Sequence, residues 1–197
     1  MDATARRWLV LRVIVGLAAL LVAVAAAAGR SEGPFTAQVV DAVSGQPIAG
    51  VVVVALYQRR TPGAVHPQLE FYDLDETVSD AHGTIRIPAR QLPASTPLAH
   101  VTGPELILFK SGYAGWHFRG VERGQHVDPA VQARQHKEGW HQFRTGGVVI
   151  EMEPATTRAD RSMARTLANY FPPIPDGRAG RLRQALDDDL ATLQKLR

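Results

Sequence analysis

Short runs of apolar and β-branched residues, separated by polar turns, dominate the middle of the chain. Residues 36–41 are rich in β-branched side chains, and residues 51–57 are apolar almost throughout. The second run is therefore predicted to be a central strand that is buried on both faces. Between the two runs, Ser44-Gly45 and Pro47 are typical of a tight polar turn. We predict that residues 41–50 connect two strands of one sandwich.

The same pattern predicts further strands along the chain. Ile85 and Ile87 alternate with polar residues, and the turn at residues 80–83 predicts a β-hairpin with the segment before it. Residues 58–74 and 119–145 are polar and are predicted to be long loops. Seven short strands separated by turn signals favour a mainly β sandwich. The predicted strands are residues 36–41, 51–57, 76–79, 84–88, 105–110, 114–118 and 147–153.

After Pro154 the pattern becomes helical, which predicts a C-terminal helical extension at residues 154–197. Thr156 or Thr157 can cap a first helix, and its apolar face is predicted to hold Met163, Leu167 and Tyr170. Asp176 can cap a second helix, in which Arg183 and Asp187 can pair. We expect a leucine stripe of that helix to be buried against the sandwich, a second copy or a partner: Leu182, Leu186, Leu190 and Leu193.

The first 28 residues form a targeting segment. Arg6 and Arg7 precede an apolar run at residues 13–28, which ends in small residues typical of a cleavage site. The run is shorter than the ~20 residues that span a bilayer comfortably, so a cleaved signal peptide and a retained anchor through residues 8–28 both remain open. Either predicts export to the periplasm or the cell exterior. Residues 29–35 are predicted to be a linker, since Gly, Ser and Pro dominate them.

Charge and cysteine content exclude several kinds of function. The whole chain carries a net charge of +3, but residues 1–28 hold three Arg and one Asp. The remaining 19 basic and 18 acidic residues give +1, so nucleic acid is not an expected partner. The chain has no Cys, which excludes disulfides, thiolate metal sites and a lipid-attachment cysteine.

Three blocks of residues between 36 and 153 carry a family resemblance. They are Val39-Val40-Asp41-Ala42-x-Ser44-Gly45-Gln46-Pro47-Ile48-Ala49-Gly50-Val51-x-Val53, Glu76-Thr77-x-Ser79-Asp80-Ala81-x-Gly83-x-Ile85-x-Ile87-Pro88 and Phe109-Lys110-Ser111-Gly112-Tyr113. In this order they resemble carboxypeptidase regulatory-like domains. The resemblance implies a prealbumin-like (transthyretin-like) seven-stranded Greek-key sandwich that acts as an accessory module rather than as an enzyme. The third block departs from the family's Lys-Pro-Gly-Tyr corner, because Ser111 stands where Pro is usual.

Aromatic and cationic residues between 113 and 144 are the candidate ligand site. Tyr113, Trp116, Arg119 and Trp140 can form a platform for a sugar, for peptidoglycan or for a peptide, because aromatic faces and Arg donors suit such ligands. The other interpretation is that these rings cover the open end of the sandwich and hold the long polar insertion in place.

Histidines in the same insertion raise a metal-site hypothesis. Three of them could meet at a zinc or copper ion, but their spacing matches no known ligand motif, and solvated loop histidines are the alternative. We expect no catalytic residue, no metal and no cofactor. The histidines concerned are His117, His126, His136 and His141.

The pattern as a whole predicts a non-enzymatic, exported or membrane-anchored β-sandwich with a binding or structural role in the cell envelope. Its expected partner is an envelope protein or a glycan. One alternative is a carbohydrate- or peptide-binding protein that uses the aromatic residues of 113–144. A second alternative is a small metal-dependent enzyme at the histidine-containing insertion.

Overall fold

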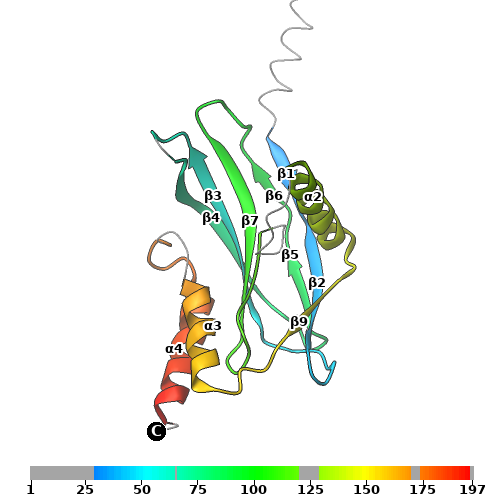
Figure 1. The fold of residues 1–197 in the computed structure, drawn as a ribbon, viewed down its shortest axis with the longest axis vertical. Coiled ribbons are helices and arrows are strands. Elements are labelled where there is room, and N and C mark those ends of the chain that lie inside the picture. Colours follow the sequence, from blue (N-terminus) through cyan, green and yellow to red (C-terminus); the bar gives the residue numbers. More distant parts are fainter. Residues whose placement is uncertain (1–28, 65, 120–128, 170–173, 196–197) are drawn as a thin grey trace, which may run out of the picture.

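The computed structural model describes residues 29–64, 66–119, 129–169 and 174–195. The prediction of a mainly β fold is confirmed, since β-sheets make up most of the ordered elements (Figure 1). The predicted signal peptide or anchor at residues 1–28 lies outside the described residues. Within the described part of the chain, no helix combines the length and the apolar character needed to cross a membrane.

The strands of the described residues form three sheets. They are β1 (Arg30–Glu32), β2 (Phe35–Asp41), β3 (Val52–Thr61), β4 (Gln68–Val78), β5 (Thr84–Ile87), β6 (Arg90–Leu92), β7 (His100–Phe109), β8 (Trp116–Phe118) and β9 (Val148–Met152). The four-stranded sheet has the order β4-β3-β7-β8 and is antiparallel throughout. The three-stranded sheet has the order β5-β2-β9, in which β2 and β9 are parallel. A small third sheet pairs β1 with β6.

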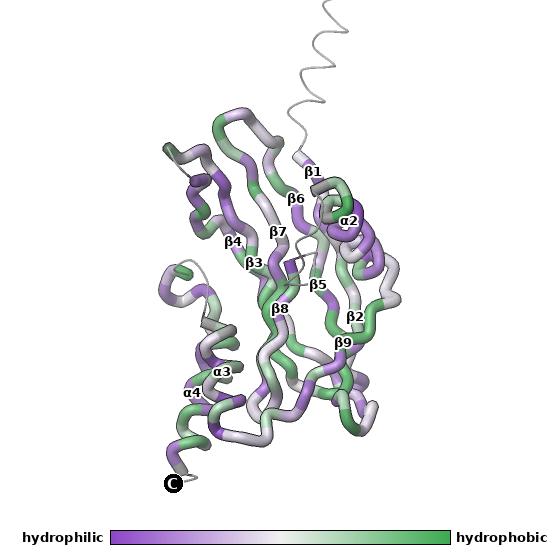
Figure 2. The backbone as a smooth tube through the Cα atoms, in the orientation of Figure 1, coloured by the Kyte–Doolittle hydropathy of each residue, from purple (hydrophilic) through white to green (hydrophobic). Residues whose placement is uncertain are grey.

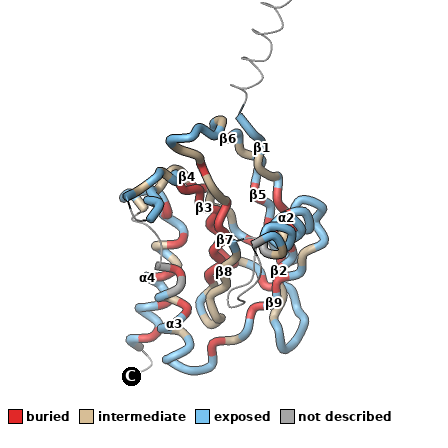
Figure 3. The backbone as a smooth tube through the Cα atoms, turned by 45° about the horizontal axis from the view of Figure 1, so that its top comes forward, coloured by how far each residue is buried: buried red, intermediate tan, exposed pale blue. Residues whose placement is uncertain are grey.

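Strand β3 is buried on both faces over its first half, as predicted. Its side chains alternate between two apolar clusters, because successive residues of a strand point to opposite faces. The cluster between the two large sheets receives Val53, Ala55 and Tyr57. The cluster on the outer face of the four-stranded sheet receives Val52, Val54 and Leu56. Figure 3 shows the resulting band of buried residues along β3 and β7.

Two C-terminal helices, α3 (Arg158–Asn169) and α4 (Gly180–Lys195), cover the outer face of the four-stranded sheet. They lie beside each other near one end of β3 and β7 (Figure 1). Leu182 and Leu186 enter the outer apolar cluster and Leu193 is also buried, so the predicted burial of the leucine stripe is confirmed for these three. Leu190 differs, since 41 % of it is exposed. Its predicted inward place is taken by Asp189, one residue earlier.

Asp189 is a buried carboxylate that ties α4 to the rest of the fold. It is only 1 % exposed, and its Oδ1 accepts a 2.6 Å hydrogen bond from the hydroxyl of Ser111, in the corner between β7 and β8. A guanidinium nitrogen of Arg165 on α3 lies 3.7 Å from its Oδ2. Because a buried charge is costly without partners, these contacts fix the register of α4 against the sheet. Ser111 therefore supplies a hydroxyl that a Pro at this corner would lack.

The two C-terminal helices are capped in different ways. Thr157 caps α3 as predicted: its hydroxyl accepts from the N–H of Asp160, and the Asp160 carboxylate accepts from the N–H of Thr157. Asp176 does not cap α4. That role falls to Glu76 of β4, which accepts the N–H groups of Arg181 and Leu182 at 3.1 and 2.9 Å.

Arg183 has a different partner from the one predicted. It binds Asp176 at 3.0 Å and the carbonyl of Ile174, rather than Asp187 one turn later. On α3, Met163 is exposed, and the small side chains of Ala164 and Ala168 face the sheet instead. The prediction is therefore wrong for Met163, while the side chain of Leu167 and the whole of Tyr170 lie outside the described part of the chain.

Several predicted connections are strands. Residues 58–61 and 68–74, predicted to be a loop, extend β3 and β4 into a long antiparallel ribbon. The predicted hairpin is also wrong, since β4 pairs with β3 and β5 pairs with β2 in the other sheet. Residues 80–83 do form the predicted turn, in which Gly83 donates to the carbonyl of Asp80 at 3.0 Å. Residues 29–35 are not a free linker, because β1 lies there.

The stripe of α4 provides a matched test of this packing. Replacing Leu186 by Ala should lower the free energy of unfolding by about 2–4 kcal/mol, because it leaves a cavity against β3. Leu190→Ala removes the same atoms from a largely exposed position and should cost less than about 1 kcal/mol. Urea denaturation of both variants measures the difference. Equal losses would contradict the packing of α4 described above.

Candidate functional site

The predicted aromatic platform is part of the hydrophobic core. The polar insertion contains a helix, α2 (Pro129–Thr145), which is mostly hydrophilic (Figure 2) but turns two rings inward. One of them, Trp140, is 5 % exposed, with its ring centroid 5.0 Å from Phe35 and 5.1 Å from Phe118. Phe143 is also buried, and Trp116 stacks on Phe118. These contacts support the interpretation in which the rings close the open side of the sandwich.

Tyr113 lies away from the other predicted ligand residues. Its hydroxyl donates a 3.0 Å hydrogen bond to the carboxylate of Asp41, at the start of the β2–β3 turn. Burial raises the pKa of Tyr113, and the hydrogen bond to Asp41 raises it further. Tyr113 therefore holds the β7–β8 corner against that turn. Arg119, by contrast, lines the pocket described below.

The histidines are spread over two elements. His117 lies on β8, whereas His136 and His141 lie on α2 rather than in the predicted loop. His126 falls outside the described residues. Within the described ranges, no group of three His, Cys, Asp or Glu side chains is placed to hold a metal ion.

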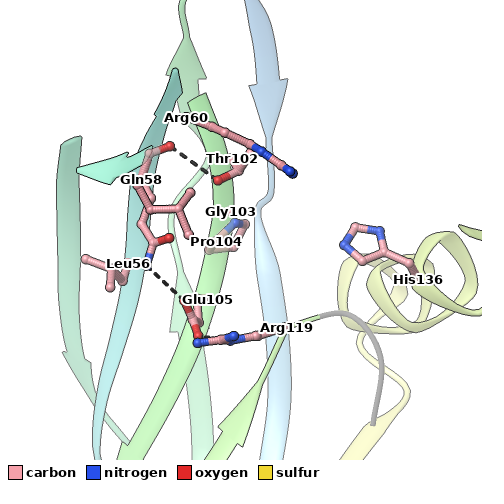
Figure 4. Close-up of a pocket in the computed structure, with 10 residues that line it drawn as sticks. Leu56, Gln58, Arg60, Thr102, Gly103, Pro104, Glu105, Arg119 and His136 are labelled. Carbon is pink, nitrogen blue, oxygen red and sulfur yellow. Dashed lines mark hydrogen bonds and ion pairs between the residues drawn. The ribbon is translucent and has the colours of Figure 1, made fainter. Parts of the chain in front are cut away.

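A pocket of about 290 Å³ lies along the polar parts of β3 and β7 (Figure 4). Strands β3 and β7 form its base, and α2 contributes one histidine at its side. Leu56 marks its boundary with the outer apolar cluster, because it belongs to both. The lining residues are Leu56, Gln58, Arg60, Leu69, Thr102, Gly103, Pro104, Glu105, Arg119 and His136.

A glycine allows β3 and β7 to pack closely at this place. The register between the two strands shifts between Leu56 and Gln58, opposite Gly103. Gly103 has a φ of +118°, and a Cβ there would lie 2.7 Å from the carbonyl oxygen of Leu56. Only glycine fits this position without moving the neighbouring strand. The irregularity directs the side chains of Gln58 and Glu105 into the same pocket.

Glu105 is the charged group at the base of the pocket. Its side chain is 9 % exposed, and Gln58 Nε2 donates a 3.1 Å hydrogen bond to its Oε2. His117 Nε2 lies 2.5 Å from its Oε1, and the Nε of Arg119 donates to the same oxygen. Burial would raise the pKa of Glu105, but the hydrogen bonds and charges of His117 and Arg119 outweigh it, so the pKa lies below its ordinary value. Glu105 is thus ionised and neutralised from within the protein.

Two guanidinium groups at the pocket have unused hydrogen-bond donors. Arg119 uses only its Nε, and its two terminal nitrogens make no hydrogen bond with any described residue. Arg60 is exposed and has no hydrogen bond or ion pair within the described part of the chain. Guanidinium donors in a fixed planar arrangement favour carboxylate ligands, which they bind through paired hydrogen bonds. With Glu105 already neutralised, the pocket offers a positive charge to an incoming group.

One edge of β7 beside the pocket has no strand partner among the described residues. Strand β8 pairs only with Leu106, Ile107 and Leu108, so it stops before the residues that line the pocket. The backbone at Thr102 and Gly103 therefore lies at a free strand edge. Such an edge can bind an extended peptide through main-chain hydrogen bonds.

The sequence singled out two residues of the pocket, Arg119 as a ligand residue and His136 as a candidate metal ligand, but not the others. Gln58 and Arg60 lay in a predicted loop, and Glu105 was treated only as the first residue of a strand. The available signal was Glu105 itself, since a charged residue directly before the apolar run at 106–109 is unusual for a buried strand.

Comparison of the chain with protein-family models, with curated proteins and with solved structures finds no match.

The lowered pKa of Glu105 predicts a pH-dependent stability. Because the folded pKa lies below the unfolded value of about 4.3, ionised Glu105 stabilises the fold above that pH. This stabilisation disappears as the pH falls through the lowered pKa. The difference in unfolding free energy between the wild type and Glu105→Gln should therefore be largest above about pH 5 and shrink towards pH 3.

Urea denaturation between pH 3 and pH 7 measures this difference. Glu70→Gln, at an exposed position on β4, is the control and should show little change at any pH. A difference for Glu105→Gln that stays constant over the whole range would contradict the assigned ion pairs.

Proposed function

We propose that this chain is a non-enzymatic, exported or membrane-anchored β-sandwich module of the cell envelope, and that it binds a peptide carboxylate in the pocket above Glu105. We further propose that its sandwich is the seven-stranded Greek key of prealbumin-like domains. The three-stranded and four-stranded sheets and the three sequence blocks support that relationship.

The observation that carries the binding proposal is the state of the charges in the pocket. Glu105 is paired internally, while Arg60 and the terminal nitrogens of Arg119 have unused donors. A carboxylate is the complementary group, because each charge-assisted hydrogen bond to it is about twice as strong as a neutral one. Thr102 and Gln58 add polar groups that can orient the ligand.

A peptide fits the lining better than a sugar does. Leu69 and Pro104 offer an aliphatic surface for a side chain, and the edge of β7 that lacks a strand partner among the described residues offers backbone groups. Sugars are commonly bound on aromatic faces. The rings predicted for that purpose, Trp116 and Trp140, pack towards the core.

The positions of the histidines in the structure do not favour the alternative of a metal-dependent enzyme. It depended on three histidines meeting in one loop, and His136 and His141 are instead on α2. The non-enzymatic function therefore stays our proposal.

Peptide binding can be tested with the full chain and a simple probe. Fluorescein-labelled tetra-alanine with a free C-terminal carboxylate should bind, and the same peptide with a C-terminal amide should bind at least tenfold more weakly. Arg60→Gln should weaken binding of the free acid by about tenfold, the effect of losing one charge-assisted hydrogen bond. Fluorescence anisotropy measures both dissociation constants.

Arg86→Gln is the matched control, because Arg86 is an exposed arginine on β5 of the other sheet. It should leave the affinity unchanged. Equal binding of the acid and the amide, or an equal loss in Arg60→Gln and Arg86→Gln, would contradict the proposed site.

A further inference from the structure

The end of the molecule at which β1 begins also carries two strand connections (Figure 1). Residues 62–67 join β3 to β4, and residues 93–99 join β6 to β7. The pairings of Arg30 with Leu92, Thr61 with Gln68 and Arg60 with His100 bring these segments to one end. We call this surface the β1 end, defined as Arg30 together with the described residues of 59–69 and 93–100.

The β1 end combines positive charge with exposed apolar side chains. It contains Arg30, Arg59 and Arg60 but no Asp or Glu. Leu98 is 78 % exposed at the tip of the β6–β7 connection, and Leu69 is exposed on β4. Acidic residues begin just outside it: Glu32 pairs with Arg30 at 3.0 Å, and Glu70 lies opposite Arg59 in the β3–β4 register. The exposed guanidinium of Arg59 lies over the ring of Tyr72 and forms no ion pair with a described residue. Exposed leucines beside arginines are typical of surfaces that rest on anionic lipids.

The chain connection places the same end next to the predicted anchor. The apolar run at residues 13–28 stops directly before Gly29, and β1 begins at Arg30. Two residues of extended chain span at most about 7 Å. If the run stays in the bilayer, the β1 end is therefore held at the lipid headgroups.

We propose that the β1 end of the anchored chain rests on an anionic phospholipid surface, with Leu98 at the headgroup boundary and Arg59 facing the phosphates. This inference rests on the membrane-anchored form of the proposed function, not on peptide binding. It also gives the domain one orientation, with the β2–β3 turn and the C-terminal helices pointing away from the membrane (Figure 1).

Because the chain has no Cys, a single introduced cysteine can be labelled without labelling any other position. Leu98→Cys and Val43→Cys introduce one thiol each, at the β1 end and in the β2–β3 turn at the opposite end. Both positions are highly exposed, at 78 % and 83 %, so an attached NBD fluorophore disturbs no packing. The full chain is reconstituted into vesicles of phosphatidylcholine alone, or with one third phosphatidylglycerol.

In anionic vesicles, the label at 98 should shift to the blue and be quenched at least twofold more by a lipid-borne nitroxide than the label at 43. Arg59→Glu should reduce that quenching towards its value in phosphatidylcholine. Equal quenching of the labels at 98 and 43 would overturn the inference. So would quenching of the label at 98 that is the same in anionic vesicles and in phosphatidylcholine vesicles. Binding of the tetra-alanine probe to the same vesicles is read separately, so a failure of either proposal can be told from a failure of the other.

Discussion

The fold depends on one strand that is apolar on both faces. Residues 52–57 of β3 carry apolar side chains on both faces, so each face must be buried by another element of the fold. The three-stranded sheet and the rings of α2 cover the inner face. Helices α3 and α4 cover the outer face, and without them Val54, Ile107 and Phe109 would be exposed together. The C-terminal helices are therefore part of the domain rather than an appendage.

The same strand explains why the pocket lies where it does. Beyond Leu56, the outward side chains of β3 change from apolar to polar, and the register shift opposite Gly103 occurs at that point. The apolar side chains end here, and the polar side chains of Gln58, Arg60 and Glu105 line the pocket instead; Arg60 is exposed, whereas Gln58 and Glu105 are buried at its base. Burying Glu105 requires partners, and His117 and Arg119 supply them. One change in sequence character thus divides this face of β3 into a half packed under the helices and a half that lines the pocket.

The sequence predicted those features that depend on local pattern. The apolar run of β3, the turn at 41–50, the Thr157 cap and the leucine stripe follow from spacing that neighbouring residues set. The errors lie where distant contacts decide. Glu76 caps α4 from another element, Asp189 is buried because Ser111 meets it, and β5 joins a different sheet from β4. At the site, Arg119 was identified for its charge, but no local pattern shows that Gln58 and Glu105 converge on it across strands.

Amide hydrogen exchange of the full chain, followed by mass spectrometry, tests the central claim that α4 is integral to the domain. If α4 covers β3, residues 180–195 should exchange in the same slow class as residues 52–57, because the two open only together. The exposed connection at residues 93–99 should exchange within seconds and serves as the internal reference. Exchange of residues 180–195 as fast as that reference, while residues 52–57 remain protected, would contradict the account.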